Sequence, residues 1–216
     1  MMIEASPIRH KNYETLAMKI ALTLALLFAC FRAFAQDMPD GTVDVYYQPQ
    51  SADGQLNSCM LVFTSLVRDH ATMKGAQVIV NGSIAIRKIG AERLMFTGKL
   101  GTRPFSAQNQ WQAPAHFFFA TANRSTAGLA KIADAESPGY KLLIAPMGDE
   151  IIQFLEEMGR SGEFTVGFNR KAGGQDVRVP VKIAVSLTKD VNGSAVKVDN
   201  EKTRVDFYAC LSKLLK

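Results

Sequence analysis

The chain has 216 residues, 47% of them hydrophobic, with 25 basic and 20 acidic side chains and a formal net charge of +5. No run of like charges concentrates this mild excess, so the sequence lacks the basic stripe that is typical of nucleic-acid-binding proteins. It also contains no internal repeat and no low-complexity tract.

A short apolar run, residues 20–31, follows a lysine near the N-terminus. Its roughly 12 residues fall short of the roughly 20 that a helix needs to cross a bilayer, but they match the hydrophobic segment of a secretory signal. The stretch Ala33-Phe34-Ala35 has the small–x–small pattern that signal peptidase accepts. The sequence therefore predicts a signal peptide cleaved between Ala35 and Gln36, and a periplasmic or secreted protein.

The same segment supports a second interpretation. Leu27-Phe28-Ala29-Cys30 resembles a bacterial lipobox, in which Cys30 would be lipidated and the protein would become an outer-membrane lipoprotein. Phe28 is bulky where that pattern prefers a small or β-branched residue, so lipidation is the alternative. The polar residues 1–17 are explained if synthesis starts at Met18, or else they form a long lead.

Removal of residues 1–35 would leave 181 residues with a net charge of about +3. This length fits one domain that can bury most of its apolar surface. The sequence therefore predicts a single β-rich exported domain over residues 36–216.

The first half of this domain predicts strands, because apolar and polar residues alternate or apolar residues run together. The expected strands cover residues 42–47, 59–64, 77–80, 83–86 and 94–97. Asn81-Gly82 lies between the third and fourth, and this dipeptide favours a type I′ hairpin turn because both central residues need positive φ. Residues 48–58 and 101–114 are predicted loops.

The second half mixes strands with two helices. Strands are expected at residues 116–120, 140–145, 164–168 and 176–187, and helices at 149–160 and 201–215, with a loop at 121–139. Pro180 cannot donate to a ladder, so its strand is expected at a sheet edge or at a bulge. The fold class is therefore mainly β, a sandwich-like antiparallel domain with two α-helices.

Both export interpretations leave the same two cysteines, Cys59 and Cys210. In an oxidising compartment such a pair predicts a disulfide, and two separate buried thiols are the alternative. The cysteines are far apart and have no histidine at ligand spacing, so they do not predict a zinc site. No cofactor and no metal are expected.

Two sets of residues suggest chemistry or binding. Ser65, Asp69 and His70 are close in sequence, but adjacency is not triad geometry and no Gly-x-Ser-x-Gly elbow supports a serine hydrolase. Trp111, Phe117 and Phe119 could form an exposed ligand patch, although phenylalanine side chains more often fill the core.

The last third of the chain resembles the invasion-associated locus B family of exported proteobacterial proteins. The matching stretches are a helix, two strands and a closing helix: 151–159, 164–168, 179–183 and 207–211. The resemblance implies a non-catalytic β-sandwich that is periplasmic or surface-linked and has a role in host-cell association.

Together these observations predict a non-enzymatic exported protein that acts through surface contacts. A binding module for an apolar or anionic envelope ligand is the first alternative, and a serine hydrolase is the second. The expected partner is a protein or an envelope component; neither a nucleic acid nor a membrane span is expected.

Overall fold

A computed structural model of the chain describes residues 40–215, except 91–92, 108–109 and 190–192. The predicted signal segment, its cleavage site between Ala35 and Gln36, and the alternative lipidation site Cys30 lie outside the described residues. These three assignments therefore stay predictions.

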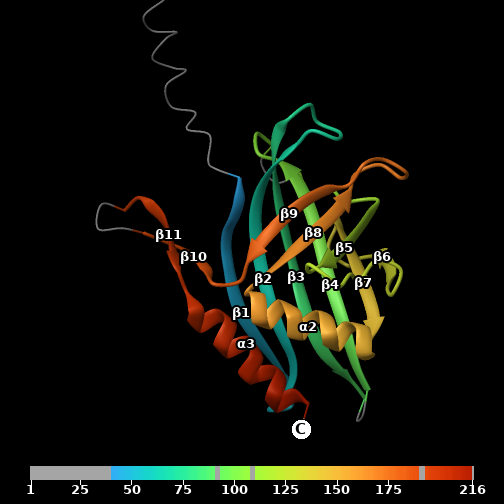
Figure 1. Cartoon of the computed structure of the whole chain (residues 1–216), viewed down its shortest axis with the longest axis vertical. Helices are drawn as coiled ribbons and strands as arrows, with labels where there is room; N and C mark the ends of the chain where they lie inside the picture. Colours follow the sequence, from blue (N-terminus) through green and yellow to red (C-terminus); the bar gives the residue numbers. More distant parts are fainter. Residues whose placement is uncertain (1–39, 91–92, 108–109, 190–192, 216) are drawn as a thin grey trace, which may run out of the picture. The chain divides into compact units, whose positions relative to one another are not determined.

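The larger layer of the fold is an antiparallel six-stranded sheet (Figure 1). In spatial order its strands are β1 (Gly41–Ala52), β2 (Gln55–Asp69), β3 (Ala76–Ile89), β4 (Arg93–Pro104), β7 (Tyr140–Pro146) and β6 (Lys131–Asp134). The first four strands follow one another through consecutive hairpin connections, which gives long ladders between sequence neighbours.

The second layer consists of a three-stranded sheet and helix α2 (Asp149–Ser161). The sheet has the order β5 (His116–Ala120), β8 (Glu163–Asn169) and β9 (Val177–Lys182). In Figure 1, α2 lies across strands of the larger sheet below this smaller one. The mainly β, sandwich-like fold predicted from the sequence is thus confirmed, including both helices.

Aromatic side chains fill the space between the layers. Phe63 of β2 meets Phe164 of β8 edge to face, with ring centroids 5.5 Å apart. Phe96 of β4 meets Phe154 of α2 in the same way at 5.9 Å. Such contacts add about 0.5–1.5 kcal/mol each beyond the burial of apolar area. The first contact joins the smaller sheet to the larger one, and the second fixes α2 onto the larger sheet.

Helix α2 forms where the sequence predicts it. Asp149 and Glu150 occupy its first turn and Arg160 its last turn, which suits the helix dipole. Gly162 ends the helix in the left-handed conformation (φ 72°), and its N–H donates to Met158 O. The buried residues Ile151, Phe154, Leu155 and Met158 face the core.

The C-terminal part adds a two-stranded ribbon and a second helix. The ribbon pairs β10 (Val185–Lys189) with β11 (Ala195–Asp199), and α3 (Glu201–Leu214) follows directly. Helix α3 contacts β1 and β2 and buries Phe207, Leu211 and Leu214. Among the described residues, no helix has both the length and the apolar character that crossing a membrane requires.

The predicted hairpin turn at Asn81-Gly82 is wrong, because both residues lie in the middle of β3. Asn81 pairs with Thr64 on one side and with Gly101 on the other. A Cβ at Gly82 would lie 2.5 Å from Lys99 O and 2.7 Å from Phe63 Cζ. The glycine therefore serves the close approach of neighbouring strands rather than a turn.

The predicted loop at 48–58 is also wrong. Strands β1 and β2 run through it and meet at a two-residue turn, Asp53-Gly54, where both φ angles are positive (52° and 76°). This is the tight hairpin connection that Asp-Gly favours. The loops predicted at 101–114 and 121–139 are shorter than expected, since β4 continues to Pro104 and β6 lies within the second.

The continuous strand predicted over 176–187 is divided in two. Strand β9 ends at Lys182, a turn follows, and β10 joins a different sheet. The alternating burial holds along β9 but stops there, since Leu187 is exposed. Pro180 lies on β9, an edge strand of its sheet, as its missing N–H requires.

Candidate functional site

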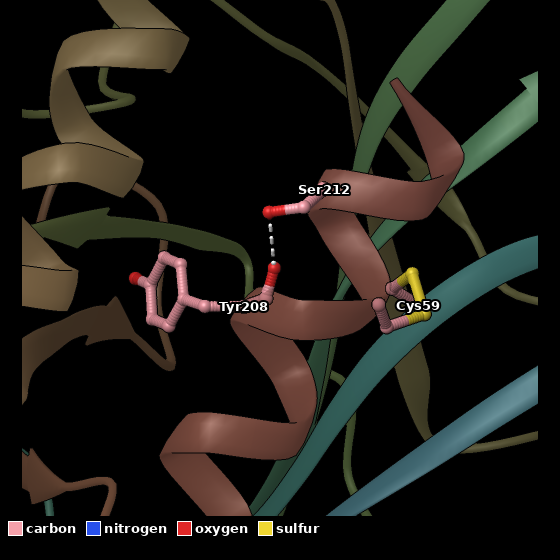
Figure 2. Close-up of a disulfide and its surroundings, with 4 residues drawn as sticks. Cys59, Tyr208 and Ser212 are labelled. Atoms are coloured by element: carbon pink, nitrogen blue, oxygen red, sulfur yellow. Dashed lines mark hydrogen bonds between the residues drawn. A yellow bond between two sulfur atoms is a disulfide. The ribbon is translucent and has the colours of Figure 1, made fainter. Parts of the chain in front are cut away.

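A disulfide fixes α3 to the larger sheet. Cys59 of β2 and Cys210 of α3 are bonded, with Cα atoms 5.9 Å apart, and both residues are buried. This is the pair predicted from the sequence. In Figure 2 the Tyr208 ring, two positions earlier on α3, points away from the disulfide. One side of α3 is therefore covalently attached to the larger sheet, and Tyr208 on another side of the helix points toward α2.

The structure does not bring the candidate hydrolase residues together. Ser65 is fully buried and its hydroxyl has no hydrogen-bond partner among the described residues, whereas His70 is exposed. The Asp69 carboxylate accepts hydrogen bonds from Thr72 N at 2.7 Å and Thr72 Oγ1 at 2.6 Å. Asp69 thus closes the turn after β2.

The candidate ligand patch is also dispersed. Phe117 and Phe119 are fully buried in the core, with 0% exposure each, so neither contributes to a surface. Trp111 is half-buried elsewhere, between the Tyr140 ring at 5.4 Å and the Arg103 guanidinium at 5.2 Å. The three aromatic residues therefore do not form one binding site.

The strongest candidate site is instead an open apolar groove of about 740 Å³ between α2 and α3. Its apolar lining comes from both helices and the segment before α2: Met147, Ile152, Leu155, Val205, Tyr208, Leu211 and Leu215. Ile152 is 43% exposed, and Val205 and Leu215 are each 61% exposed. This volume lies within the range of small-molecule sites, about 300–1,000 Å³.

The two helices touch closely at one point. Tyr208 Oη donates to Leu155 O at 2.7 Å. The Tyr208 ring lies against Gly159, where a Cβ would be 2.7 Å from the ring. Burial raises the pKa of the Tyr208 phenol, so the hydroxyl stays protonated and keeps its donor role. Gly159 and Tyr208 together set the spacing of the groove walls.

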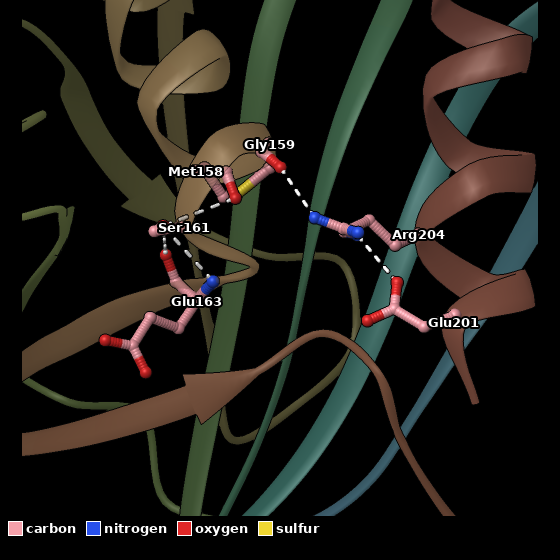
Figure 3. Close-up of polar contacts among 6 residues, drawn as sticks. All are labelled: Met158, Gly159, Ser161, Glu163, Glu201 and Arg204. Carbon is pink, nitrogen blue, oxygen red and sulfur yellow. Dashed lines mark hydrogen bonds and ion pairs between the residues drawn. The ribbon is translucent and has the colours of Figure 1, made fainter. Parts of the chain in front are cut away.

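A polar contact joins the helices near the same end. Arg204 of α3 donates through Nη1 to Gly159 O at 3.1 Å and through Nε to Glu201 Oε2 at 2.8 Å (Figure 3). Ser161 Oγ donates to Glu163 O at 2.9 Å just beyond the end of α2. Arg204 thus uses the free carbonyl near the end of α2 to hold α3 in place.

A polar depression of about 590 Å³ lies next to the groove. Glu157 lines it and accepts hydrogen bonds from Thr121 Oγ1 at 2.7 Å and Asn123 Nδ2 at 2.6 Å. The bond from Thr121 is the main reason why the pKa of the Glu157 carboxyl is lowered. Glu156 and Arg160 line both the depression and the groove, so the two cavities adjoin along α2.

Sequence reasoning missed the groove, although it found both helices. The available signal was that Ile152 and Val205 are apolar at positions outside the core-facing stripes. Within the part of the chain that the structure describes, no three His, Cys, Asp or Glu side chains gather in a way that could hold a metal ion. Comparisons with protein-family models, curated proteins and solved structures gave no match.

Proposed function

We propose that this is an exported, non-enzymatic binding protein whose groove between α2 and α3 takes the hydrocarbon chain of a small ligand. The observation that carries the proposal is the open apolar groove, with large hydrophobic side chains exposed along it. Water in contact with Ile152, Val205 and Leu215 is released when an apolar chain covers them, which favours binding by about 25 cal/mol per Å².

The size of the site favours a small ligand over a protein partner. Helices of 13 and 14 residues are about 20 Å long, and two of them side by side present about 400 Å². A stable protein interface buries about 800 Å² on each partner. The face is too small for such an interface, whereas the volume suits a ligand.

Export and family membership are part of the same proposal. The disulfide is compatible with an oxidising compartment, and it supports a signal peptide over residues 1–35 and a single exported domain over 36–216. The resemblance of the last third to the invasion-associated locus B family stays a prediction, and it agrees with a non-catalytic role.

Binding can be measured with N-phenyl-1-naphthylamine, a neutral apolar dye that fluoresces when it leaves water. We expect saturable binding at one site, and Ile152→Asp should weaken it at least tenfold because a carboxylate would stand in the groove. Leu187→Asp is the matched control, since Leu187 is also 43% exposed but lies on β10 outside the groove. Equal loss in both variants, or no saturable binding to the unchanged protein, would overturn the proposal.

A further inference from the structure

We infer that the ligand is a single-chain amphiphile with a zwitterionic head group, whose chain lies in the groove and whose head lies in the polar depression. This inference rests on the proposed function, because it assigns the chemistry of the end of the ligand that the groove does not hold. The feature that carries it is the junction of an apolar cavity with a polar one along the same helix.

Glu156 and Arg160 form that junction, since they line both cavities. They are four positions apart on α2, which places their Cβ atoms on one face of the helix, about 5–6 Å apart. A ligand chain that leaves the groove past these residues therefore brings its head between a carboxylate and a guanidinium.

The other charged groups around the two cavities already have partners. Glu157 accepts hydrogen bonds from Thr121 and Asn123. Arg124 lies 3.5 Å from Glu150, and Arg204 is paired with Glu201. The two arginines are thus paired within the protein, whereas Glu157 keeps its negative charge because Thr121 and Asn123 are neutral donors.

Glu156 and Arg160 are exposed, and within the described residues neither makes a hydrogen bond or a close ion pair, although the Arg160 charge is one cause of the lowered pKa of the Glu157 carboxyl. The lining of the depression carries two carboxylates, Glu156 and Glu157, and two guanidinium groups, Arg124 and Arg160, so it has no net charge. An anionic head would gain from Arg160 but would be repelled by Glu156. A head that carries an ammonium and a phosphate would pair with both, which is the better electrostatic match.

The test displaces the naphthylamine dye with monomeric amphiphiles that share one acyl chain and differ in the head. We would compare a lysophosphatidylcholine (zwitterionic), a lysophosphatidylglycerol (anionic) and a monoacylglycerol (uncharged). The zwitterionic ligand should bind tightest, and affinity should rise about fourfold for each methylene added to the chain.

Two variants separate a zwitterionic site from an anionic one. Glu156→Gln and Arg160→Gln should each weaken the zwitterionic ligand about two- to fivefold, the range for exposed ion pairs. For the anionic ligand, Arg160→Gln should weaken binding and Glu156→Gln should strengthen it. Lys189→Gln, a charge change on β10 outside both cavities, is the control and should change neither affinity.

The outcomes distinguish this inference from the proposed function. Equal affinity for all three heads, tightest binding of the anionic ligand, or stronger zwitterionic binding in Glu156→Gln would overturn the head-group assignment and leave the apolar groove intact. Displacement by free phosphocholine, or sedimentation of the protein with phosphatidylcholine vesicles, would also overturn it, because the ligand would then not be a single-chain monomer. Failure of every amphiphile to displace the dye would overturn the proposed function itself.

Discussion

Removal of the disulfide between Cys59 and Cys210 is expected to lower the free energy of unfolding by as much as about 5 kcal/mol. The two cysteines are 151 positions apart, so the bond restricts nearly the whole described part of the unfolded chain. Because both residues are buried, the suitable variant is Cys59→Ala/Cys210→Ala; serine would place hydroxyl groups in the core at an additional cost.

The loss should be largest in α3. Without the bond, the helix is held mainly by buried Phe207, Leu211 and Leu214, each of which contributes about 2 kcal/mol of apolar burial. Helix α3 should therefore still dock in the variant but open more often than the sheet. Since α3 forms one wall of the groove, affinity for the apolar dye should fall in parallel.

Two measurements check this expectation. Denaturant unfolding of the unchanged protein and the double variant gives the difference in stability, and amide hydrogen exchange locates it. We expect faster exchange in α3 than in β2–β4, whose amides serve as the internal control. A loss of less than about 1 kcal/mol, the size of an ordinary substitution, or unchanged exchange in α3, would refute the view that the bond holds this helix.

Three further changes probe the fold and the site. Gly82→Ala should destabilise the protein by about 2 kcal/mol or more in denaturant unfolding, because the new methyl group would lie 2.5 Å from the Lys99 carbonyl oxygen. An unchanged denaturant midpoint would contradict the close approach of β3 and β4 at this glycine. Alanine at Gly159 would ordinarily stabilise a helix by about 1 kcal/mol, but here it would meet the Tyr208 ring, so we expect a net loss of about 1–2 kcal/mol and weaker dye binding. The hydrogen bond from Thr121 is the main cause of the lowered pKa of the Glu157 carboxyl, so the ionised carboxylate stabilises the folded protein above pH 4.5. This stability is lost as the pH falls through the pKa of Glu157 in the folded protein. The melting temperature of Glu157→Gln should therefore change less with acidification than that of the unchanged protein.

Local patterns in the sequence predicted the elements that depend on local physics. The acidic first turn and the glycine stop of α2 depend only on neighbours in the chain, and both are where they were expected. Turn dipeptides were less reliable, since Asn81-Gly82 and Asp53-Gly54 carry the same signal and only the second forms a turn. The difference is tertiary, because Gly82 is required where Phe63 and the Lys99 backbone come close.

The groove could not be predicted in this way, because it is a relation between two helices separated by about 40 residues of chain. Its residues look like ordinary surface positions until α2 and α3 are placed side by side. Apolar residues outside the core stripes, such as Val205, indicate an uncovered apolar surface but do not identify the element that lies opposite it. The candidate patch around Phe117 failed for the opposite reason, since a run of phenylalanines in a strand fills the core.

Each wall of the groove is attached to the larger sheet, in addition to the hydrogen bonds that join the two helices. Phe154 fixes α2 through its contact with Phe96, and Cys210 fixes α3 through its bond to β2. The helices meet where Tyr208 contacts Leu155 and Gly159 and where Arg204 contacts the Gly159 carbonyl. The apolar side chains beyond these contacts could cover one another if a buried anchor moved. Moving a core phenylalanine or breaking a disulfide costs several kcal/mol, more than covering a few half-exposed side chains would gain. The groove is therefore preorganised, and a ligand that enters it needs to order little beyond its own chain.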